Sequence, residues 1–137
     1  MSSPIHKETV VNAEPRNIYE SLLSSEAFSA ITGAPAQIDP SAGGEFSCFG
    51  GIITGRNIEL VPDQTIVQAW RVKFWDPKDY SIVRFDISPE ADGARLKLQH
   101  KGFPDELRSH LNGEAAEGGW DRQYLEPISR YFAAAND

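Results

Sequence analysis

Three histidines are the first residues in this 137-residue sequence that could bind a metal ion or transfer a proton. His6 lies in a predicted strand, His100 at a predicted strand end and His110 near a predicted helix start. Their separations do not match those of ligands that share one metal ion. We therefore expect no metal site and no cofactor.

Other catalytic chemistry has little support in the residues. The single cysteine, Cys48, lies in a Phe-Ser-Cys-Phe context that offers no group to stabilise a thiolate, so we expect a small core or edge residue. The carboxylate pairs Asp105–Glu106 and Glu114/Glu117 lie where a helix is predicted to begin, and acidic groups there interact favourably with the helix dipole. The sequence contains no motif of a serine hydrolase, a zinc protease or a nucleotide phosphate loop. We expect no catalytic residues and no enzyme activity.

Two polar residues are predicted to point into the core, Gln68 beside Trp70 and His100 beside Leu98. Burying a polar group without a hydrogen bond costs about 1–3 kcal/mol, so each must find a partner or line a wet pocket. Aromatic residues on the same side would either pack into a core or leave a gap that admits an apolar ligand. The candidate ligand-binding residues are Phe46, Gln68, Trp70, Phe85, Leu98, His100, Trp120 and Tyr124.

The elements that must position these residues begin with a strand and two helices. β-Branched residues and alternation predict a strand over Ile5–Asn12. An apolar stripe and a proline in the first turn predict a helix over Ala13–Leu23. A second, short helix would be capped by Ser24 or Ser25 and ended by Gly33 in the left-handed conformation.

From Pro35 to His100 the sequence predicts an antiparallel meander without helices, because Gly, Pro and Asp residues separate runs of strand type. In the last three strands apolar residues alternate with Arg and Lys, which predicts one core face and one solvated, basic face. The predicted strands are Ala36–Ile38, Gly44–Phe49, Ile52–Val61, Thr65–Phe74, Tyr80–Ser88 and Ala94–Lys101.

A long C-terminal helix is predicted because apolar residues recur there at helical spacing. Pro127 inside this helix predicts a kink near Gln123. The sheet has one apolar face to cover, so we predict an α+β fold of order β-α-α-β6-α in which a curved antiparallel sheet grips this helix. A cavity between sheet and helix becomes possible. The apolar stripe consists of Trp120, Tyr124, Ile128, Tyr131 and Phe132.

Length and composition narrow the classes of protein. A chain of 137 residues is expected to form a single domain over residues 1–137. The net charge of −7 and the absence of adjacent basic residues argue against a nucleic-acid partner. No apolar run is long enough for a signal peptide or a membrane span, so we expect no membrane partner. A lone cysteine fits a reducing, cytoplasmic setting.

The charge is distributed unevenly along the chain, with a net charge of −5 over residues 1–65, +2 over residues 66–103 and −4 over residues 104–137. The basic residues of the middle region are predicted on the outer strand faces. They would form either an ordinary solvated face or a patch that attracts an acidic protein partner. The candidate partner-binding residues are Arg71, Lys73, Arg95 and Lys97, with Lys101 beside them.

Glycine-rich and apolar segments of the chain carry a resemblance to a known family. The segments Gly43–Phe46, Gly50-Gly51 with Gly55, and Ile58–Arg71, the last containing E-L-V-P-x-x-x-I-V-x-x-W-R, are similar to the activators of the heat-shock protein 90 ATPase. Trp120 with its preceding glycine, followed by Tyr124 and a helix, resembles the C-terminal signature of that family. The likeness runs from about Ile5 to Phe132 and covers only the C-terminal domain of the eukaryotic activators.

This resemblance implies membership of the START-like, or SRPBCC, superfamily with its helix-grip (Bet v-like) fold. Many members of that superfamily have a deep hydrophobic cavity that binds lipids, hormones or polyketides. The family name implies a role in stress response as a chaperone activator.

Three functions stay open at this point. The first is a non-enzymatic binding module whose cavity holds a small apolar ligand. The second is a protein-interaction module that acts on heat-shock protein 90 through the basic sheet face. The third is an enzyme of the polyketide cyclase kind, in which His100 or Gln68 orients a substrate.

Overall fold

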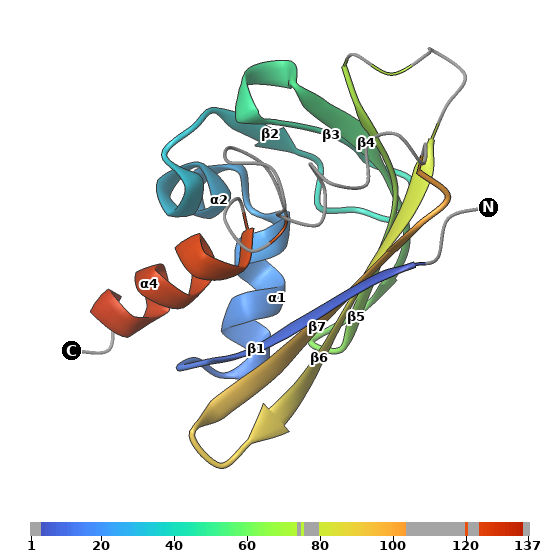
Figure 1. Ribbon diagram of the computed structural model, residues 1–137. Helices are drawn as coiled ribbons and strands as arrows, with labels where there is room; N and C mark the ends of the chain where they lie inside the picture. The colour runs from blue at the N-terminus through green and yellow to red at the C-terminus, as the bar shows by residue number, and fades with distance from the viewer. Residues whose placement is uncertain (1–3, 74, 76–79, 104–119, 121–123, 136–137) are drawn as a thin grey trace.

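Seven antiparallel strands form one curved sheet, and helices α1, α2 and α4 lie on one side of it (Figure 1). The structure is a computed structural model that describes residues 4–73, 75, 80–103, 120 and 124–135. The predicted α+β helix-grip fold is confirmed. The elements are β1 (Ile5–Val11), α1 (Pro15–Leu23), α2 (Ser25–Thr32), β2 (Ala36–Ile38), β3 (Glu45–Cys48), η1 (Phe49–Gly51), β4 (Ile53–Val61), β5 (Thr65–Val72), β6 (Ser81–Glu90), β7 (Gly93–Lys101) and α4 (Glu126–Ala135).

The sheet is a meander closed by the first strand. Its order is β1-β7-β6-β5-β4-β3-β2, so β2 to β7 each pair with their neighbours in sequence. β1 pairs along its whole length with β7, from Ile5 opposite His100 to Val11 opposite Ala94. This pairing joins the start of the chain to the last strand.

Local hydrogen bonds set the ends of the two N-terminal helices. α1 begins at Pro15, two residues later than predicted. Proline is favoured at the first helical position, where its missing N–H costs no hydrogen bond. The Ser24 hydroxyl accepts a hydrogen bond from the N–H three residues later, and Gly33 ends α2 with a φ of 75°, as predicted. Ser25, the alternative cap, instead accepts a hydrogen bond from the N–H of Ile38 at 2.7 Å. This bond ties α2 to the edge strand β2.

The strand region contains one helical turn where we predicted no helix. Phe49–Gly51 form the short 3-10 helix η1, with φ values of 55°, 67° and 95°. Two consecutive glycines adopt this left-handed backbone without a Cβ clash, so the predicted strand over Gly44–Phe49 ends at Cys48. At the other end of the sheet β6 extends past its predicted end to Glu90. Phe74, placed in a strand by the prediction, lies outside the described residues.

Alternation along the central strands places the core on the face that carries the helices, as predicted. On β5 the residues Ile66, Gln68 and Trp70 are buried. β6 and β7 contribute buried residues at the same period of two, whereas Arg84 and Lys97 between them are exposed. The further buried residues of these two strands are Ser81, Val83, Phe85, Ile87, Ala94, Leu96, Leu98 and His100.

The C-terminal helix buries a narrower stripe than the sequence predicts. Tyr124 and Leu125 adopt a π-helical turn, after which α4 packs against α2 and β1. Ile128 is fully buried, but Tyr131 is 37% exposed because it lies on the flank of the stripe, with its ring edge-on to Phe132. The predicted kink near Gln123 lies outside the described residues.

The glycines of the sheet differ in what a side chain would meet. Gly55 on β4 lies opposite Phe46 and Trp70, and a Cβ there would overlap the carbonyl oxygen of Ala69 and the Phe46 ring. Gly50 in η1 has a positive φ, but no atom lies within 4 Å of a Cβ added to it. Gly55 is therefore required by close packing, and Gly50 only by its backbone angle.

We predict that Gly55→Ala lowers the free energy of unfolding by about 3 kcal/mol through overpacking. Gly50→Ala is the matched control, and its left-handed backbone should cost only about 1 kcal/mol. Urea unfolding of both variants measures the difference. Equal losses would contradict the close packing of β3, β4 and β5 around Gly55.

Candidate functional site

His100 lies at the centre of a buried hydrogen-bond network. Its Nδ1 accepts a hydrogen bond from the indole N–H of Trp120 at 3.0 Å, and its Nε2 lies 2.7 Å from the hydroxyl oxygen of Ser81. The Ser81 hydroxyl donates its single hydrogen to the backbone carbonyl of Trp70 at 2.9 Å. The Nε2–H of His100 must therefore be the donor to Ser81. Both ring nitrogens are satisfied by a neutral imidazole in one tautomer.

Aromatic rings exclude water from this histidine. The ring centroids of Trp70 and Phe103 each lie 4.9 Å from that of His100, and that of Trp120 lies 5.3 Å away. Burial lowers the pKa of His100 from its ordinary 6.5 to about 3. A second proton on Nδ1 would also point at the N–H of Trp120, so the imidazole stays neutral at physiological pH.

The network does not have the arrangement of a catalytic serine–histidine pair. In such a pair the imidazole accepts the hydroxyl proton, whereas the hydroxyl proton of Ser81 points to a backbone carbonyl. His100 has no exposed surface, and Ser81 has only 1%. As it stands, neither group can reach a substrate proton, so the network acts as a structural link between β5, β6, β7 and Trp120.

A second buried network holds Gln68. Its amide Nε2 donates to Oδ1 of Asn57 at 3.2 Å, and the amide of Asn57 donates to the carbonyl of Asp39 at 2.9 Å. The main chain of Asn57 also bonds to Gly43 and Gly44. Gln68 therefore has a polar partner, and Asn57 fastens the connection between β2 and β3 onto β4.

Several of the other candidate ligand-binding residues line a very small void in the interior. Leu22, Phe28, Ile38, Phe46, Cys48, Gln68, Phe85 and Tyr124 line an enclosed space of about 10 Å³. That volume admits about one water molecule. Ring contacts fill the space around it, with Trp120 and Tyr124 at 4.5 Å and Trp70 and Trp120 at 5.2 Å. The described part of the interior is packed.

Seven of the eight candidate ligand-binding residues thus fall into two adjoining groups, and Leu98 lies beside the first. Phe46, Gln68, Phe85 and Tyr124 line the small void, and Trp70, His100 and Trp120 form the histidine network. Leu98 lies opposite Phe85 in the sheet. Sequence reasoning missed Ser81 and Asn57, although Ser81 precedes Val83 by two residues and so shares its inward face.

Burial also controls the other titratable groups of the interior. It raises the pKa of the Cys48 thiol to about 12, which removes its nucleophilic form at neutral pH. It raises the pKa of Tyr124 well above its ordinary value, and the nearby indole N–H of Trp70 acts in the opposite direction. That indole N–H makes no hydrogen bond of normal geometry.

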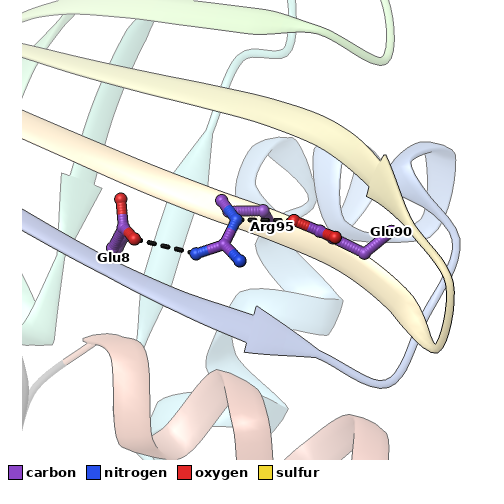
Figure 2. Close-up of polar contacts among 3 residues, drawn as sticks. All are labelled: Glu8, Glu90 and Arg95. Atoms are coloured by element: carbon purple, nitrogen blue, oxygen red, sulfur yellow. Dashed lines mark hydrogen bonds and ion pairs between the residues drawn. The ribbon is translucent and has the colours of Figure 1, made fainter.

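The candidate basic residues lie in two groups on the outer face of the sheet. Arg95 donates to Glu8 at 2.8 Å and to Glu90 at 2.6 Å (Figure 2). Lys97 lies directly opposite Glu8 on β1 and Asp86 on β6. These two cations therefore lie among carboxylates.

Arg71 and Lys73 lie near the other end of the sheet. The Arg71 guanidinium donates to the carbonyl of Trp75 at 2.8 Å and lies 5.8 Å from the ring centroid of Tyr80. Lys73 follows the end of β5 and is exposed. The acidic groups described around Arg95 and Lys97 belong to β1 and β6, so the two pairs of candidate residues lie at different ends of this face.

A comparison with models of protein families shows to which family the chain belongs. A family model described as activator of Hsp90 ATPase homolog 1-like protein matches residues 12–133. The chain belongs to this family. The family assignment and the fold agree with the resemblance read from the glycine-rich and Trp-Arg segments.

Curated relatives within the family are longer than this chain. The activator of 90 kDa heat shock protein ATPase homolog 1 of Homo sapiens is 29% identical over 126 residues, which cover 92% of this chain and 36% of that protein. The Dictyostelium discoideum homolog is 32% identical over 123 residues, covering 87% of this chain and 30% of its own length. The chain spans about a third of the length of these relatives.

Solved structures share the fold. An HSP90 activator from Plasmodium falciparum superposes with a TM-score of 0.83 at 23% identity, covering 96% of this chain and 97% of that one. A protein from Mesorhizobium loti gives a TM-score of 0.79 at 21% identity, with 98% and 99% covered. Within the described residues, no helix has the length and apolar character needed to cross a membrane.

The buried neutral histidine leads to a prediction about acid stability. The unfolded chain takes up a proton on His100 near pH 6.5 and the folded chain only near pH 3, so stability should fall as pH decreases through this range. The loss should approach about 1.4 kcal/mol per pH unit from this group. In His100→Asn that contribution disappears, so the stability advantage of the wild type should shrink between pH 6.5 and pH 3.

Denaturant unfolding at a series of pH values measures this difference. His6→Asn, which removes an exposed imidazole from β1, is the control for a change of the same type at the surface. Parallel pH profiles of the wild type and His100→Asn would contradict a neutral, buried His100.

Proposed function

We propose that this chain is a non-enzymatic binding module that acts on an Hsp90-class chaperone through its surface. The observation that carries the proposal is the packed interior, whose described void has room for about one water. Because the described interior leaves no room for a ligand between sheet and helices, we assign binding to the surface. The family relatives carry the name of Hsp90 ATPase activators.

The outer face of the sheet is the surface best suited to such contact. The described helices all lie on the opposite side of the sheet, so none of them covers this face (Figure 1). Charged side chains on it steer an encounter and discriminate between partners. The proposed partner-binding residues are Arg71, Lys73, Arg95 and Lys97.

We predict that the purified chain binds an Hsp90-class chaperone and raises its ATPase rate at low ionic strength. Lys73→Glu should raise the concentration of the chain that gives half-maximal stimulation by about five-fold, because a charge at the edge of an interface changes electrostatic steering. Arg130→Glu on α4 makes the same change of charge on a different surface and is the matched control. An unchanged ATPase rate together with no detectable binding would contradict the proposal.

A small apolar ligand inside the fold is the second candidate function. It is favoured by the buried Trp70 indole N–H, which lacks a hydrogen-bond partner of normal geometry, and by the void beside Gln68 and Tyr124. A ligand would have to displace aromatic side chains from their present contacts.

Native mass spectrometry of the purified chain with lipid and aromatic libraries tests this candidate. We predict that no ligand is retained, since the described interior has no space for one. A stoichiometric bound lipid or aromatic compound would contradict this and would move the functional site to the interior.

A further inference from the structure

β1 is the strand at one edge of the sheet. Its seven residues, Ile5–Val11, pair with β7, and in the described part of the chain no strand pairs with its other edge. An edge strand directs a row of main-chain N–H and C=O groups away from the sheet, and these groups can pair with another extended chain. The hydrogen-bond pattern of the neighbouring strands determines which residues of β1 carry them.

The pairing of β6 with β7 sets this pattern. The two strands keep one register along their whole paired length. Opposite residues of an antiparallel pair alternate between positions that exchange two hydrogen bonds and positions that exchange none. Pro89 opposite Ala94 has no N–H, and the N–H of Ile87 donates at 2.8 Å to the carbonyl of Gln64 rather than to β7. These positions exchange no bonds, so Ala94 and every second residue of β7 after it direct their main-chain groups toward β1.

The same alternation continues on β1. Val11 lies opposite Ala94, so Val11 and every second residue before it exchange hydrogen bonds with β7. The residues between them, His6, Glu8 and Val10, therefore direct their N–H and C=O groups away from the sheet. No hydrogen bond between described residues joins these groups to a loop or a helix. Each of the three residues thus offers one main-chain donor and one acceptor to an added strand.

α4 forms a groove with this edge. Figure 2 shows α4 alongside β1, on the side away from β7, and the two elements are packed together. A strand added to β1 lies about 4.8 Å from it, so alternate side chains of that strand point toward α4. The space there is a hollow of about 320 Å³ lined by Glu8, Thr9, Leu125, Glu126, Ser129 and Arg130.

The side chains of β1 decide between possible occupants of the edge. The two-fold register that pairs the whole of β1 with a second copy puts Glu8 opposite its own equivalent, and like charges directly opposite destabilise a strand pair. A partner segment with uncharged, β-branched side chains avoids this repulsion. On the outer face such side chains pack on Val10, which is 45% exposed, and toward α4 they meet Thr9 and Leu125.

We propose that β1 and α4 form a docking site for an extended segment of a partner protein, which adds to the sheet as a further strand. The main chain of the segment pairs with His6, Glu8 and Val10, and its β-branched side chains pack on Val10 and in the hollow beside Ser129. The site lies at the edge of the sheet rather than on its outer face, so the inference is independent of the proposed chaperone contact.

Amide hydrogen exchange followed by NMR spectroscopy tests the strand addition. The probe is the capped peptide Lys-Val-Thr-Val-Thr-Val-Lys, and the comparison peptide carries N-methyl groups on its five central residues, which removes their donors. In the free chain the amides of Glu8 and Val10 should exchange faster than those of Lys7 and Thr9. The probe should slow exchange at Glu8 and Val10 by about ten-fold or more, and the methylated peptide should not. Protection of both amides in the free chain, or no added protection with the probe, would overturn the proposal.

A variant of β1 tests the main-chain pairing by calorimetric titration with the same probe. Val10→Pro removes one outward N–H and no hydrogen bond to β7, so the chain should stay folded and its affinity should fall by about ten-fold. Val10→Thr keeps the N–H and the branched Cβ and is the matched control, with affinity within about two-fold of the wild type. Wild-type affinity in folded Val10→Pro would overturn the proposal.

A variant of α4 tests the hollow without changing β1, and it decides the case if Val10→Pro does not fold. The indole of Ser129→Trp fills the hollow and should weaken binding of the probe by about ten-fold, whereas Ser129→Ala should bind within about two-fold of the wild type. Unchanged affinity in Ser129→Trp would overturn the proposal. So would a dimer of the chain, seen by sedimentation, that Val10→Pro dissociates while the probe fails to bind.

Discussion

The hydrogen bonds of His100 are the interaction on which the rest of the structure depends. They connect the main chain of β5, Ser81 of β6, His100 of β7 and the indole of Trp120, and so add side-chain links to strands that already pair through their main chains. A buried imidazole without both partners would cost a large part of the stability of a small domain, so the network must be complete. Its completion brings Trp70, Phe103 and Trp120 into ring contact and leaves the described interior packed.

The packing of the described interior is the reason why we place the function of this helix-grip fold at its surface. The described helices lie on one side of the sheet, and this side forms the core (Figure 1). On the second side, Arg95 pairs with Glu8 and Glu90 (Figure 2), and Arg71 and Lys73 lie toward the other end. The alternation that builds the core therefore also builds the surface that we propose as the interface.

Much of the fold could be predicted from the sequence, because the signals for it are local. Ser24 and Gly33 mark the ends of α2 through one hydrogen bond and one backbone angle, and the period of two on β5, β6 and β7 marks the inward face. The predictions were wrong where a backbone angle or the exposure of a side chain depends on the surrounding residues. Phe49 takes a positive φ beside two glycines, and Tyr131 lies on the flank of its helical stripe.

The sequence by itself determined the fold class, the meander of consecutive strands and the inward direction of Gln68 and His100, since each follows from periodicity and turn residues close in the chain. Only the tertiary structure decided what these side chains do. Asn57 and Ser81 supply their partners from other strands, and Glu8 reaches Arg95 across a pairing that joins the first strand to the last. Hydrogen bonds and ion pairs act over about 3 Å, so their partners are set by which strands lie side by side rather than by distance along the chain.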